Sequence, residues 1–159
     1  MSIINFSITR QMEGLFDAIN PIKELIESKI NLSRTADREK RINLNQNKVM
    51  RICFIVGLSL PTKRSIDDYK DIQLSVSSIR ITPSFFTMHD LSTLYSALLK
   101  LRYADLNIDW TQNATLSRII AAEMLRGRDY LMSDNNLDSF LYAMNNKVAM
   151  AKDITVLNL

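Results

Sequence analysis

Four charged residues in one short polar stretch have the types and spacing of a metal-dependent hydrolase site. Asp67, Asp68 and Asp71 lie beside Lys70, and Asp68 and Lys70 have the Asp-x-Lys spacing of metal-dependent nucleases. Carboxylate oxygens suit Mg²⁺, but the ion would need a further carboxylate from a neighbouring element. A solvated turn explains the same residues more simply, because runs of acids beside Pro and Ser are ordinary loop content. A metal-dependent hydrolase is therefore only a distant hypothesis.

Other reactive residues are few. His89 and Asp90 are adjacent, as in the central pair of metal-dependent phosphohydrolases, but such a site needs further histidines and the chain has one. Structural zinc needs four Cys or His ligands, and Cys53 and His89 are the two candidates. Cys53 stands in an apolar run, which indicates a small buried hydrophobe. The three glycines are isolated, so neither a dinucleotide-binding nor a P-loop motif exists. We expect no metal, no cofactor and no enzymatic activity.

The densest positive charge lies between residues 34 and 51. In a helix, Arg34, Arg38 and Arg41 would share one face and offer guanidinium groups to phosphates. A basic loop is the other interpretation of the segment. Asp37 and Glu39 lie inside it, so a solvated surface of mixed charge is the simpler explanation. The candidate nucleic-acid-binding residues are Arg34, Arg38, Lys40, Arg41, Lys48 and Arg51.

The composition favours helices as the elements that position these residues. The chain has 159 residues, of which 47% are hydrophobic and 23% charged, and its net charge is +3. Three glycines stand where average usage predicts roughly eleven, so little material is available for hairpins. One cysteine allows no internal disulfide. No signal peptide or transmembrane segment is evident. These features predict a cytoplasmic or otherwise intracellular protein, for example one packed within a viral particle.

The pattern of apolar residues predicts two N-terminal helices followed by a strand pair. The first two apolar faces meet at Pro21, which indicates a bent helical pair or one helix kinked there. The run 49–60 is rich in β-branched and aromatic residues and ends at Pro61, as a buried strand would. The segment 71–82 alternates apolar and polar residues with one slip at a candidate bulge. A helical interpretation of 71–82 remains open, but the alternation favours an antiparallel pair of 49–60 with 71–82.

After Pro83 the chain is predicted to be helical almost to its end. Three helices are expected, with Gly127 just beyond the second and Ser133 or Asp134 capping the third. The tail 154–159 suits a short edge strand or a contact with a neighbour. The predicted fold class is α+β, mostly helical, in a single domain 1–159. It comprises an N-terminal helical arm (1–31), a basic segment (32–50) and a core (49–159).

The absence of a catalytic constellation, together with apolar faces at both ends, predicts a protein that works by contact. The leading hypothesis is a non-enzymatic, self-associating structural protein that forms a homo-oligomer or a larger assembly, such as a coat or matrix-type component of a virus or phage. The alternative is a nucleic-acid-binding module that uses residues 34–51. The candidate oligomer contacts are Met12, Leu15, Phe16, Ile19, Leu157 and Leu159.

Overall fold

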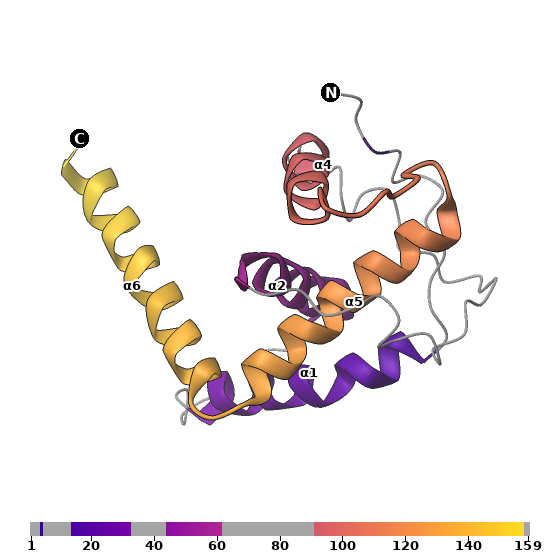
Figure 1. Ribbon diagram of the computed structural model, residues 1–159. Coiled ribbons are helices and arrows are strands. Elements are labelled where there is room, and N and C mark those ends of the chain that lie inside the picture. Colours follow the sequence, from indigo (N-terminus) through magenta and orange to yellow (C-terminus); the bar gives the residue numbers. More distant parts are fainter. Residues whose placement is uncertain (1–3, 5–13, 33–43, 62–90, 158–159) are drawn as a thin grey trace.

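The computed structural model describes residue 4 and residues 14–32, 44–61 and 91–157, with the backbone alone for Phe16, Leu32 and 147–157. This part of the chain is helical and contains no β-strand (Figure 1). Its helices are α1 (Leu15–Leu32), α2 (Gln46–Ser59), α4 (Leu91–Arg102), α5 (Asn113–Met132) and α6 (Asn136–Leu157). The predicted α+β fold class is therefore wrong for the described residues.

The segment 49–60, predicted as a strand, belongs to helix α2 as far as Ser59, and Leu60 follows the end of the helix. Asn45 begins the helix, and its side chain accepts a hydrogen bond from the backbone N–H of Asn47 at 2.8 Å. The buried residues recur at helical intervals: Val49, Met50, Cys53, Phe54, Val56 and Gly57. A continuous apolar run does not distinguish a buried strand from a buried helix, and a length beyond about ten residues favours the helix. Strand propensity was outweighed here by packing against α5.

The predicted strand pair is incompatible with the structure of its first member, 49–60, which is not a strand. Segment 71–82 lies outside the described residues, as does the candidate bulge, so its own structure is not part of the description. The partner assigned to it, 49–60, is helical along nearly all its length. The pairing of 49–60 with 71–82 is therefore wrong whatever conformation the second segment has.

Helix α1 replaces the predicted pair of N-terminal helices within the described residues. It continues through Pro21 to Leu32, with Pro21 exposed on its surface. Leu15, Ile19, Ile22 and Ile26 are 0–2% exposed and form one face at intervals of three and four residues. The sequence predicts an apolar face on each side of Pro21, and these four buried residues belong to those faces. One helix through Pro21 agrees with the alternative interpretation of the junction, whose kink at Pro21 stays a prediction.

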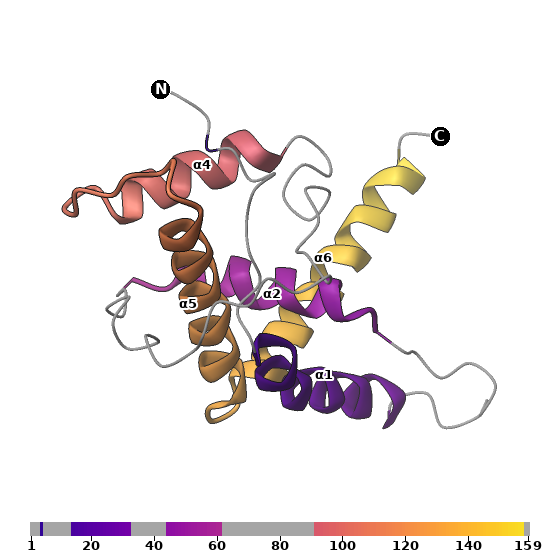
Figure 2. The same cartoon turned by 90° about the vertical axis from the view of Figure 1, so that its right-hand side faces the viewer.

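The core is built around α5, which crosses α2 near its middle (Figures 1 and 2). Nine consecutive residues, from Ile119 to Gly127, are buried, so α5 is covered on every side at this level. Gly127, predicted to follow the end of this helix, lies inside it, because α5 continues to Met132. The predicted edge strand at 154–159 is also wrong for residues 154–157, which belong to α6.

Two glycines allow α2 and α5 to approach backbone to backbone. A Cβ added to Gly127 would lie 2.7 Å from the carbonyl carbon of Cys53 and 2.8 Å from the backbone nitrogen of Gly57. A Cβ added to Gly57 would lie 2.8 Å from the carbonyl carbon of Glu123. Both are closer than a real Cβ comes to backbone atoms. Glycine at these two positions therefore fixes how close the central helices lie.

Candidate functional site

All four residues of the predicted hydrolase site lie outside the described part of the chain. This holds for Asp67, Asp68, Lys70 and Asp71, and for His89 with its neighbour Asp90. Among the residues that are described, no group of three or more His, Cys, Asp and Glu side chains is placed to hold a metal ion. The hydrolase hypothesis therefore stays a prediction from sequence.

The predicted nucleic-acid-binding residues divide in the same way. Arg34, Arg38, Lys40 and Arg41 lie in 33–43, outside the described residues. Lys48 is exposed in the first turn of α2, and Arg51, one turn further on, is half-buried. The two residues that are described do not by themselves form a basic patch, so this site also stays a prediction.

Two of the candidate oligomer contacts at the N-terminus, Leu15 and Ile19, are placed toward the chain's own core. Leu15 and Ile19 are 1% and 0% exposed on the inner face of α1, so they are not free to meet a second molecule. The backbone of Phe16 belongs to α1 and that of Leu157 ends α6, while Met12 and Leu159 lie outside the described residues.

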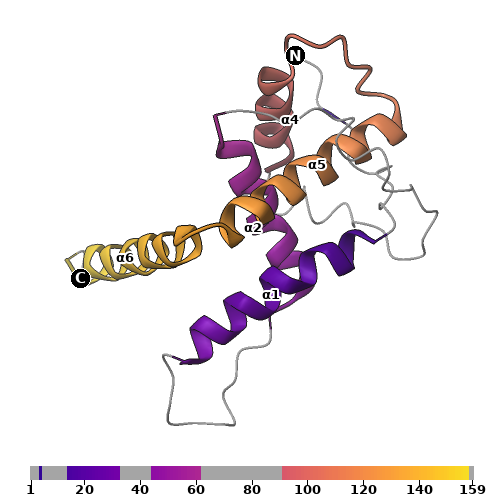
Figure 3. The ribbon, with the colours of Figure 1, turned by 60° about the horizontal axis from the view of Figure 1, so that its bottom comes forward.

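Helix α6 leaves the body formed by the other helices. Leu137 is 2% exposed and Phe140 and Leu141 pack partly against the core, whereas Met144, on the same face one turn later, is 47% exposed. These four residues are the α6 stripe. Every residue from Tyr142 to Asn146 is exposed, more than a full turn, and the helix continues to Leu157 (Figures 1 and 3). Residues 142–157 are therefore an arm that projects from the body.

Helix α4 carries a second exposed apolar face, the α4 stripe of Leu94, Leu98 and Leu101. These residues recur at intervals of four and three, which places them on one side of the helix, and they are 51%, 37% and 75% exposed. The opposite side, with Tyr95 and Leu99, is buried. Beside the stripe lies a hollow of about 340 Å³, the α4 groove, lined by Leu58, Leu60, Pro61, Leu98, Leu101 and Arg102.

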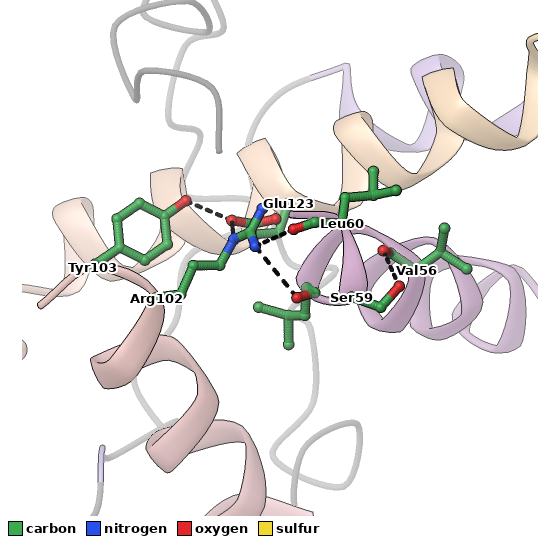
Figure 4. Close-up of polar contacts among 7 residues, drawn as sticks. Val56, Ser59, Leu60, Arg102, Tyr103 and Glu123 are labelled. Atoms are coloured by element: carbon green, nitrogen blue, oxygen red, sulfur yellow. Dashed lines mark hydrogen bonds and ion pairs between the residues drawn. The ribbon is translucent and has the colours of Figure 1, made fainter. Parts of the chain in front are cut away.

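Arg102, which lines the α4 groove, also belongs to a polar cluster with Glu123 and Tyr103 (Figure 4). Arg102 Nε lies 2.6 Å from Glu123 Oε1, and the Tyr103 hydroxyl donates to the same oxygen at 2.7 Å. The Arg102 Nη1 group also donates to the carbonyl oxygens of Leu58, at 3.3 Å, and Leu60, at 2.5 Å. These carbonyls belong to the end of α2, where helices leave acceptors unpaired. One guanidinium thus joins α4, α5 and the end of α2.

Sequence reasoning missed this cluster. Glu123 stands among apolar residues of its helix although it is a carboxylate, and it is 1% exposed. A buried carboxylate requires a cationic or hydrogen-bonding partner. The acidic residue amid Ile119, Ile120 and Met124 was thus the available signal. Its partner, 21 residues earlier in the chain, could not be identified without the fold.

Buried thiol and phenol groups should make the protein less stable in alkali. Burial raises the pKa of Cys53 from 9.0 to about 12. Burial, and then the charge of Glu123, raise the pKa of Tyr103 above its ordinary value of 10.0. Above pH 9 the unfolded chain therefore releases protons that the folded chain retains, so the free energy of unfolding falls as pH rises.

This fall can be measured by urea unfolding between pH 7 and 11. We expect little contribution from these groups below pH 8, a decline beginning near pH 9 with Cys53, and a steeper one above pH 10 as Tyr103 joins. The variant Cys53→Ala should lose the first part of the decline and retain the second. A free energy of unfolding that stays level in wild type to pH 11 would contradict the prediction.

No helix in the described part of the chain is both long and apolar enough to span a membrane. No protein-family profile, curated protein or solved structure matches this chain.

Proposed function

We propose that this chain acts by contact, as a non-enzymatic, self-associating structural protein whose arm binds other copies. The observation that carries the proposal is the rise in side-chain exposure along the α6 stripe. Its apolar residues pass from 2% exposure at Leu137 to 47% at Met144 while the helix continues. The apolar side of the helix thus extends beyond the body that covers its first turns.

Helix energetics support a partner for the arm. The sixteen residues from Tyr142 to Leu157 extend about 24 Å at 1.5 Å per residue. Most helical stability in proteins comes from packing an amphipathic face and not from the intrinsic preference of the residues. An ion pair of 2.7 Å between Lys29 and Asp138 joins α1 to the first turn of α6. Contact with another copy would supply the packing that the rest of the helix needs.

The α4 stripe points to the same class of function. Exposed leucines are ordinary when scattered, whereas a contiguous apolar patch beside a hollow is typical of interaction sites. Leu101, at 75% exposure, is the most exposed large hydrophobic residue described. Two separate apolar surfaces, on α4 and on α6, are what a chain needs in order to contact more than one site on its neighbours.

Light scattering across micromolar concentrations tests the proposal. Wild type should have a mass above the 18.3 kDa of one chain, and the mass should rise with protein concentration. Met144→Asp places a charge within the α6 stripe and should shift the association to at least ten-fold higher concentration, since each lost 1.4 kcal/mol is a factor of ten. A wild type that is strictly monomeric would refute self-association.

Tyr142→Asp is the matched control for this experiment. Tyr142 is 70% exposed and lies two residues from Met144, which places it on the opposite side of the helix. The substitution introduces the same charge at nearly the same point of α6. It should therefore leave the mass unchanged, and equal losses from both variants would mean that the α6 stripe is not the contact.

Nucleic-acid binding by residues 34–51 stays a prediction beside this proposal. Within the described residues, exposed Lys48 and half-buried Arg51 are its only representatives. No described feature favours it over self-association, so we do not advance it as a second function.

A further inference from the structure

One residue near the start of the sequence is fastened to the buried side of α4. Ile4 belongs to no helix, yet it is 4% exposed and is part of the hydrophobic core. Its backbone N–H donates a hydrogen bond of 3.0 Å to the hydroxyl oxygen of Ser96, which is 3% exposed. Ser96 follows Leu94 by two residues, which places it across α4 from the α4 stripe. The contact of Ile4 with Ser96 is thus separate from the α4 groove.

The contact matches two features of Ile4 to two features of its surroundings. A buried hydroxyl costs free energy unless it is hydrogen-bonded, and so does a buried backbone N–H. The Ser96 hydroxyl and the Ile4 N–H meet this need in each other. Ser96 shares the buried side of α4 with Tyr95 and Leu99, which are 2% and 0% exposed, so the place is otherwise apolar. It therefore suits a residue that brings an aliphatic side chain together with its own backbone N–H.

Arg102 holds α4 to the body in a different way. It binds Glu123 of α5 and two carbonyl oxygens at the end of α2. Glu123 and Arg102 both lie within helices, whose backbone hydrogen bonds form and break cooperatively. Ile4 has no helix around it, and local opening costs least free energy where such support is missing. Release of Ile4 would therefore leave α4 attached through Arg102 and free the place beside Ser96.

From these contacts we infer that the place on α4 that Ile4 fills, the Ser96 site, is an exchangeable peptide-binding site that the chain occupies with its own residue. Its ligand is a peptide segment with an aliphatic residue whose backbone N–H donates to the Ser96 hydroxyl. The chain's own Ile4 and an added peptide of the same sequence compete for this site. The inference concerns a single chain and does not rest on the proposed self-association.

Fluorescence anisotropy with a labelled peptide of residues 1–10 tests the site in the full chain. Ile4→Asp replaces a buried aliphatic side chain by a charge, which should empty the site and let the peptide bind. Burial of an isoleucine is worth about one to two factors of ten in an equilibrium constant. Wild type, which fills the site with its own Ile4, should therefore bind the peptide at least ten-fold more weakly. Ile55→Asp is the matched control: it makes the same replacement at an isoleucine that is 46% exposed, and it should bind no better than wild type.

Further variants show whether the peptide occupies the place that Ile4 leaves. A peptide that carries Ile4→Asp should not bind. Ser96→Ala, added to the Ile4→Asp chain, removes the acceptor and should weaken binding of the unaltered peptide at least about three-fold. Equal affinities of wild type, Ile4→Asp and Ile55→Asp, or no binding by Ile4→Asp, would overturn the inference. Ile4→Ala replaces Ile4→Asp in the assay if the latter loses its helical circular dichroism; if both lose it, Ile4 is an ordinary core residue and the inference is overturned.

Discussion

Replacing Gly127 by alanine is expected to destabilise the protein by about 3 kcal/mol, although alanine is the better helix former. In an uncrowded helix interior the same change would stabilise by about 1 kcal/mol. At Gly127 the new methyl group would lie 2.7 Å from the Cys53 carbonyl carbon and 2.8 Å from the Gly57 nitrogen. Both are backbone atoms, so the methyl group fits only if α2 and α5 separate, and overpacking of this kind costs roughly 1–3 kcal/mol or more.

Thermal and urea unfolding measure this prediction directly. For a chain of this length a loss of 3 kcal/mol should lower Tm by about 6–12 °C. The variant Ala97→Gly, at an exposed position within α4, measures the helix propensity of alanine relative to glycine without crowding. It should lower the free energy of unfolding by up to about 1 kcal/mol. A stabilised Gly127→Ala protein would show that the helices do not approach as closely as described.

A second glycine variant shows whether both positions act on one crossing. Gly57→Ala should also destabilise, because its methyl group would meet the backbone of Glu123. Separation of α2 from α5 relieves both clashes at once. The double variant should therefore lose less free energy of unfolding than the two single losses combined.

The helical content could be predicted from sequence because scarce glycine and amphipathic spacing both point to it. The buried face of α1 and the existence of α4, α5 and α6 followed from intervals of three and four residues. The helical structure of α2 could not be predicted in the same way. A continuous apolar run has no periodicity that distinguishes a strand from a helix. Gly127 was misread for a related reason: a glycine that ends a helix and one that admits a neighbouring backbone look alike in sequence.

The candidate interaction surfaces were only partly predictable. Leu15 and Ile19 belong to an apolar face, but a sequence does not reveal whether such a face meets its own core or a second molecule. The exposure of Leu101 and Met144 depends on where α4 and α6 end relative to the body. That arrangement is a property of the packed helices, and no local pattern encodes it.

Removing the carboxylate of Glu123 is expected to lower the free energy of unfolding by about 3–5 kcal/mol. Glu123→Leu removes the carboxylate that lies 2.6 Å from Arg102 Nε and accepts a hydrogen bond from the Tyr103 hydroxyl at 2.7 Å. Breaking a buried pair by removing one partner is costly because the remaining charge is uncompensated. For comparison, Asp138→Asn removes the exposed pair with Lys29 and should cost under about 1 kcal/mol.

The double variant Arg102→Met/Glu123→Leu tests the physical reason for that loss. Replacing a buried ion pair by apolar residues of similar volume is often neutral, because neither charge then has to be desolvated. Two carbonyls at the end of α2 lose their donor in the double variant, so recovery should be incomplete. We expect it to be at least about 2 kcal/mol more stable than the sum of the two single losses implies. Strictly additive losses in urea unfolding would mean that Glu123 acts through packing alone, and that Arg102 joins the three helices without it.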